Sequence, residues 1–209
     1  MQLTNLARAD LAILFRKVDN AELLRDQLRE ILPRLVALYG SAAATLAADW
    51  YDDLREAERV RSRFIAIPTV LPDTDRTDAL ARWGVGPLFQ ADPEPATALE
   101  KTAGGLQRII ADASRQTVLG SITEDPEAVG WSRATAGGCD FCQLIAGRGA
   151  VYSAETADFA SHDSCHCVAV PEYGEGRQVR AFTPSQRFST QEQRDVHNAR
   201  LRAALNSNT

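Results

Sequence analysis

The chain has 209 residues, of which 44% are hydrophobic and 24% charged, and its formal net charge at pH 7 is −5. This composition is typical of a folded globular protein, and the length allows one large domain or two small ones. The negative balance argues against broad non-specific DNA binding, which needs a basic face. No apolar run approaches the roughly 18 residues that cross a bilayer, and the N-terminus lacks the basic region and cleavage site of a signal peptide.

Residues 1–121 show the apolar periodicity of helices. Near the N-terminus apolar residues recur on one helix face: Leu11, Leu14, Phe15 and Val18. Asp19 with Glu22 resembles a capping box and predicts the start of a second helix, which Pro33 should end or kink. A third helical segment is expected over residues 34–64, with an alanine-rich middle where another helix could approach closely.

Two further helices are expected before residue 121. A short one should run from Asp75 to Trp83 and close at Gly84. A longer one should begin at Asp92-Pro93, since proline is favoured at the first helical position, and should end at Gly120.

The character of the sequence changes after this helical region. Short apolar pieces between Gly, Ser and Thr predict strands over residues 128–134, 150–153 and 167–170, with a turn or two of helix over 140–146 and a turn over 171–176. The predicted class is therefore α+β. A helical region (1–121) is followed by a small β-rich module (122–173), and then by an extended arm and terminal helix (174–209).

The strongest chemical signal is a cluster of metal-binding residue types. All four cysteines, and two of the three histidines, lie between Cys139 and Cys167. Their spacing is C-x2-C, nineteen residues, then H-x2-C-x-C. Disulfides are improbable without export, so we interpret the cluster as a metal site. A C-x2-C turn supplies half of a tetrahedral zinc site.

Five donors compete for four positions in such a site: Cys139, Cys142, His162, Cys165 and Cys167. One set leaves Cys165 outside, and the other uses four cysteines and leaves His162 outside. His166 lies between two cysteines and should point away from them if the chain is extended there. We expect a structural zinc closed by protein ligands, since a catalytic zinc keeps one position open for water.

Catalytic motifs other than this cluster are absent from the sequence. The chain contains no phosphate-binding loop and no G-x-S-x-G elbow to activate a serine. We therefore do not expect an enzyme. A head-maturation protease or a zinc-dependent hydrolase is the alternative, considered because of the resemblance described next.

The segment GWSRATAGGCDFCQLIAGRGAVYSAETADFASHDSCHCVAVPEY resembles the C-terminal motif of the Mu F-like minor head proteins of tailed phages. It is most similar to the actinobacteriophage branch. The shared features are the C-x2-C, a glycine-containing turn, the H-x2-C-x-C, and a short apolar strand followed by Pro171. The chain also has 21 arginines and only 2 lysines, as expected of a GC-rich genome.

This resemblance implies a virion component in the interior of the phage head, assembled in the host cytoplasm. Its expected partners are the portal and/or the major capsid protein, and its expected role is head assembly or DNA delivery. Packaged DNA is a further candidate partner through the arginine-rich tail after residue 176. Neither a membrane nor a small-molecule substrate is expected.

Overall fold

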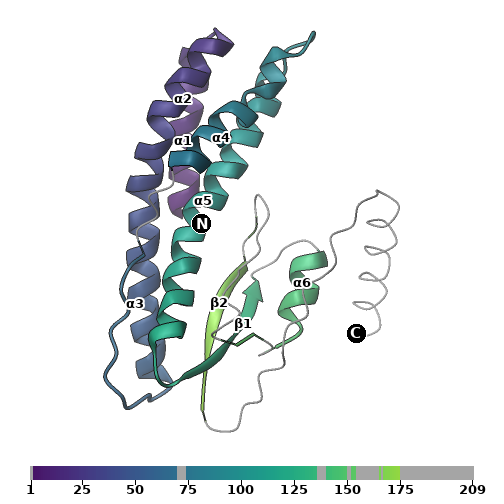
Figure 1. Ribbon diagram of the computed structural model, residues 1–209. Helices are drawn as coiled ribbons and strands as arrows, with labels where there is room; N and C mark the ends of the chain where they lie inside the picture. The colour runs from purple at the N-terminus through teal and green to yellow at the C-terminus, as the bar shows by residue number, and fades with distance from the viewer. Residues whose placement is uncertain are drawn as a thin grey trace.

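The computed structural model describes residues 2–69, 74–135, 140–149, 152–153, 165 and 167–174. The helices form an elongated bundle, and a two-stranded sheet lies against one half of it, with a short helix beyond the sheet (Figure 1). The class is α+β, as predicted. The predicted terminal helix, within residues 190–205, lies outside the described residues.

The first two helices are α1, Gln2–Lys17, and α2, Ala21–Leu35. Helix α2 begins one residue later than predicted, because Asn20 rather than Asp19 is the cap. The Asn20 side chain accepts a hydrogen bond from the Leu23 N–H at 2.8 Å, which satisfies one of the unpaired donors of the first turn.

Pro33 does not end α2. The chain continues through a π-helical segment, η1, Val36–Gly40, into α3, Ser41–Ala57. Because proline lacks an N–H, it removes one bond of the helix ladder, and a wider π turn follows closely. Helix α3 ends seven residues before its predicted end at residue 64, where Arg59 takes a left-handed conformation with φ of 57°.

The continuous helix Ala21–Ala57 is long and apolar enough, by length and composition, to cross a membrane. The expectation that no segment is apolar enough to cross a bilayer therefore does not hold for this helix. A core helix can share these properties, and the inner face of this one packs on α4 and α5.

Helix α4, Thr74–Gly84, confirms the predicted short helix, and a 3-10 turn, η2, Gly86–Phe89, follows it. Helix α5, Pro95–Glu124, begins two residues later than predicted, with Pro95 as its first residue. It also continues past Gly120, because packing of its last turns outweighs the weak helix propensity of one glycine.

Two other glycines allow α4 and α5 to pack closely. A Cβ added at Gly84 would lie 2.2 Å from Thr102 Oγ1, and one added at Gly105 would lie 2.3 Å from Leu80 Cδ1. These distances are far below van der Waals contact, so a larger residue at either position would force Thr102 or Leu80 on the facing helix to shift.

Strands β1, Ala128–Thr135, and β2, Cys167–Tyr173, pair antiparallel, with Thr135 opposite Cys167. The strands predicted over residues 128–134 and 167–170 are confirmed. Strand β2 extends through Pro171, so the turn predicted at Pro171 is wrong, and Pro171 sits opposite Trp131 in the ladder. On the other edge of β1, Trp131 makes a single bridge to Tyr152, within the strand predicted over residues 150–153.

The short helix α6, Asp140–Ala146, is confirmed. It lies on the far side of the sheet from the bundle (Figure 1). The sheet and α6 share one core with the bundle rather than forming a separate one. That core joins side chains of α3 and α5 to the module: Ala47, Ala48, Tyr51, Ala66, Val118, Leu119, Ile122, Trp131, Cys142, Ile145, Tyr152, Cys165, Cys167 and Ala169.

Val168 does not belong to this core, although it lies on β2 between two residues that do. It is 44% exposed, because side chains alternate along β2 and those of Cys167 and Ala169 take the inner face. The module packs on the part of the bundle formed by residues 47–51 of α3 and 118–122 of α5.

Candidate metal centre

Three of the five predicted donors lie together in the structure. Cys142 comes from α6, Cys167 is the first residue of β2, and Cys165 immediately precedes that strand. Their Sγ atoms all lie within 4.8 Å of one another, and those of Cys142 and Cys165 are 3.8 Å apart. All three side chains are buried, with exposures of 1% to 4%.

This geometry fits a tetrahedral metal. Thiolates bound to zinc at about 2.3 Å in tetrahedral geometry are separated from one another by about 3.8 Å. The distance between Cys142 and Cys165 matches that value. The three cysteines are thus close enough to serve as three of the four ligands of one metal ion, and Cys165, which one expected donor set left outside, is part of the cluster.

The other two predicted donors, Cys139 and His162, lie outside the described residues, as does His166. Each precedes a described cysteine by three residues in the sequence, Cys139 before Cys142 and His162 before Cys165. Either residue could supply the fourth ligand, so both expected ways of completing the site remain predictions.

The surroundings of Cys167 favour the thiolate. Burial raises the pKa of this thiol, but hydrogen bonds with Cys142, Thr135 and Cys165 and the positive charge of Arg133 lower it. The net pKa lies below its ordinary value. Cysteine binds metals as the thiolate, so the local electrostatics suit a metal ligand.

A buried arginine from the bundle holds the ligand segment. The Arg115 side chain, on α5, is almost fully buried, and its Nε donates to the Cys167 carbonyl oxygen at 3.0 Å. Its Nη2 donates to the Cys165 carbonyl oxygen at 2.8 Å. One guanidinium therefore fixes the backbone of both cysteines of the C-x-C and leaves their sulfur atoms available.

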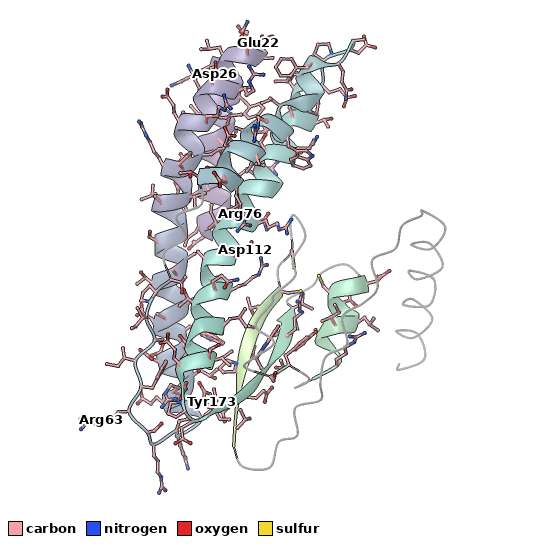
Figure 2. All side chains as sticks on the ribbon, viewed as in Figure 1. Glu22, Asp26, Arg63, Arg76, Asp112 and Tyr173 are labelled. Carbon is pink, nitrogen blue, oxygen red and sulfur yellow. The ribbon has the colours of Figure 1, made fainter. Side chains whose placement is uncertain are left out.

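Arg115 is itself fixed by a neighbouring carboxylate. Its Nη1 donates to Asp112 Oδ1 at 2.8 Å, and Asp112 Oδ2 accepts from Arg76 Nη2 at 2.6 Å. Figure 2 shows Arg76 and Asp112 on the side of the bundle that faces the sheet. The chain of charged contacts runs from α4 through α5 to β2, so the ligand segment is attached to two helices.

Sequence reasoning missed Arg115, because it lies about fifty residues before the cysteines that it holds. A signal was nevertheless present. Asp112 and Arg115 are one helical turn apart in a stretch of the helix where Ile109, Ile110 and Ala113 are buried. Charged residues at such positions need buried partners.

A second buried ion pair holds the other end of β2. Arg55, on α3, pairs with Asp125, which follows α5, and Tyr51 Oη donates to the same carboxylate oxygen at 3.0 Å. The Arg55 guanidinium lies 5.9 Å from the ring centre of Tyr173, the last residue of β2. Burial, together with the neighbouring Tyr173 and the Asp125 carboxylate, raises the pKa of Tyr51, so it remains a neutral donor.

Of the three tryptophans, only Trp131 is fully buried. Its ring stacks on Tyr152 with ring centres 4.1 Å apart, and the two backbones exchange hydrogen bonds of 2.8 and 3.3 Å. Trp50 and Trp83 are 38% and 50% exposed. Trp131 therefore reports on the packing of the module.

Replacing Arg115 by Met should loosen the ligand segment. The change leaves the two carbonyl oxygens without their charged donor and leaves Asp112 with Arg76 alone, and it should lower the free energy of unfolding by about 3–5 kcal/mol. Loss of such a supporting contact also typically weakens metal binding by about 10- to 100-fold. Guanidinium unfolding and zinc competition with a chromophoric chelator measure the two effects.

The matched control is Arg8→Met. Arg8 also pairs with a carboxylate of α5, that of Glu100, but both side chains are at least half exposed. Such a pair contributes less than about 1 kcal/mol. If the two variants changed stability and zinc affinity equally, Arg115 would not have the role assigned to it.

Comparison with known proteins gives one match. A family model described as VG15 protein matches residues 1–190. No curated protein and no solved structure matches the chain. Since the match spans nearly the whole chain, the bundle, the sheet and the cysteine cluster all fall within it, and the chain belongs to the VG15 family of viral proteins.

Proposed function

We propose that this chain is a structural minor head protein of a tailed phage, and that one structural zinc closes its C-terminal module. Membership of a viral family supports the viral setting. The resemblance of residues 130–173 to the Mu F-like motif supports the place in the head. The buried cysteine cluster supports the zinc.

The observation that carries the structural role is the burial of all three cysteines in the core that the module shares with the bundle. Cys142, Cys165 and Cys167 belong to the core that includes α3 and α5, and each is at most 4% exposed. A catalytic zinc needs a position open to water and substrate, whereas a structural zinc is closed by protein ligands. Burial of this kind favours the closed site.

A bound zinc would link elements that are far apart in sequence. Cys142 would contribute from α6, and Cys165 and Cys167 from the start of β2, with Cys139 or His162 as the fourth ligand. The module has few apolar residues of its own, so a metal cross-link would add stability where the core is small. The bundle would be left to contact the portal or the inner capsid.

Protein purified under reducing conditions without chelator should contain one zinc per chain. Cys142→Ser should lose the metal and lower the melting temperature. It removes a buried ligand, and without the metal ion the negative charge of the remaining thiolates is not neutralised. Metal analysis and native mass spectrometry measure the first effect, and thermal unfolding measures the second. His166→Ala is the control and should keep the zinc. Absence of metal from the unmodified protein would contradict the zinc site.

The head assignment predicts that the protein co-purifies with particles. Quantitative mass spectrometry of purified proheads and virions should find it at low copy number relative to the major capsid protein. Its absence from both would refute the assignment. The alternative is a maturation protease. It would be favoured if the unmodified protein cleaved head proteins and the Cys142→Ser variant did not.

A further inference from the structure

The connection between α3 and α4 carries the two most exposed of the large apolar side chains described. Ile65 is 77% exposed and Ile67 is 70% exposed. Exposure alternates along this segment: residues 61, 63, 65 and 67 are exposed, and residues 62, 64 and 66 face the protein. A period of two is that of an extended strand.

The inner side of this segment is held firmly by α3. Arg55 Nη2 donates to the Ser62 carbonyl oxygen at 2.7 Å, and the Ala66 N–H donates to Asp52 Oδ1 at 3.0 Å. The Phe64 ring packs against Tyr51, with ring centres 5.8 Å apart. The two isoleucines are therefore presented on a segment with a defined conformation.

The backbone contacts follow the same alternation. In an extended strand the N–H and C=O groups of successive residues point to opposite edges. Those of Ser62 and Ala66 face α3. Within the described part of the chain, the backbone groups of Arg63, Ile65 and Ile67 make no hydrogen bond. One edge of the segment is therefore open in the way that an edge strand is open.

Charge marks one end of this open edge. Arg59, Arg61 and Arg63 are exposed, and no ion pair to them is found among the described residues. Figure 2 shows Arg63 pointing away from the bundle. Three positive charges stand close together on a chain whose net charge is −5. The edge is thus basic at one end and apolar at the other.

We propose that residues 61–67, the docking edge, bind an extended segment of a partner protein. That segment adds as a β-strand, with acidic side chains facing Arg61 and Arg63 and apolar side chains facing Ile65 and Ile67. Backbone bonds supply affinity in this mode of recognition, and alternate side chains supply specificity.

Other occupants match only part of the docking edge. Duplex DNA would pair with the arginines, but it would leave two isoleucines exposed beside a highly polar surface. A membrane would cover Ile65 and Ile67, but it would leave the open backbone groups without hydrogen-bond partners in apolar surroundings. A protein strand satisfies the charges, the apolar side chains and the backbone together. This inference does not depend on the zinc or on the place of the protein in the head.

A set of eight-residue peptides tests the proposal with the full chain. Each peptide has Thr at every second position. The positions between carry either Glu or Lys in one half of the peptide and either Val or Ser in the other half. Each combination is made twice, once with the charged half first and once with it last. We expect the Glu–Val peptides to bind at least tenfold more tightly than the Lys–Val or Glu–Ser peptides. Fluorescence anisotropy measures the affinities. No binding by any peptide, or a preference for Lys–Val, would overturn the proposal.

Variants of the protein locate the binding. Ile65→Ser with Ile67→Ser should abolish it, and Arg61→Glu with Arg63→Glu should reverse the preference toward Lys–Val. Leu38→Ser is the control, because Leu38 is also largely exposed, at 62%, but lies on η1. A loss of binding in the control as large as that in the isoleucine variant would overturn the proposal, because binding would then reflect any exposed apolar residue.

Amide hydrogen exchange by NMR tests the edge itself. On binding, the amides of Arg63, Ile65 and Ile67 should become protected, and that of Ala66, already bonded to Asp52, should change little. Protection without this alternation would contradict strand addition. Sedimentation of the protein alone gives a further check. If the protein self-associated and the isoleucine variant did not, the docking edge would bind a second copy of this chain. That result would overturn the proposal of a different partner protein.

Discussion

The contact of the Arg115 guanidinium with the carbonyl oxygens of Cys165 and Cys167 determines how the two halves of this protein fit together. A charged group buried in the bundle is stable only where its donors are satisfied. Here the backbone of the C-x-C satisfies two of them and Asp112 a third. The hydrogen bonds that satisfy the buried Arg115 guanidinium therefore also fix the backbone of two candidate metal ligands. This anchoring helps to place their sulfur atoms near that of Cys142.

The second ion pair extends this logic along β2. Arg55 and Asp125 hold the strand at Tyr173, as Arg115 holds it at Cys167. Between the two anchors the sheet shares its core with α3 and α5. The β-rich module thus uses the helical region for packing, and the candidate zinc joins α6 to a strand that the bundle already positions. A metal in this setting would stabilise an arrangement formed jointly by distant parts of the chain.

Features that depend on nearby residues could be predicted from the sequence, and features that depend on long-range packing could not. The C-x2-C and C-x-C spacing identified the three cysteines that the structure brings together. Alternation and turn residues predicted both paired strands. In contrast, Pro33 and Gly120 suggested helix ends, but each lies inside a helix that tertiary packing maintains. Arg115 carried no local motif, since its partners are distant in sequence.

The central claim is that bundle, sheet and cysteine cluster form one cooperative unit held by Arg115. Equilibrium unfolding of zinc-loaded protein, with Trp50 and Trp83 replaced by Phe, tests it most directly. Fluorescence then reports only Trp131 in the sheet, and circular dichroism reports mainly the helices. We predict that the two transitions coincide in guanidinium. A separate, earlier loss of the Trp131 signal, with the helices still intact, would show that the module unfolds independently and would contradict the account.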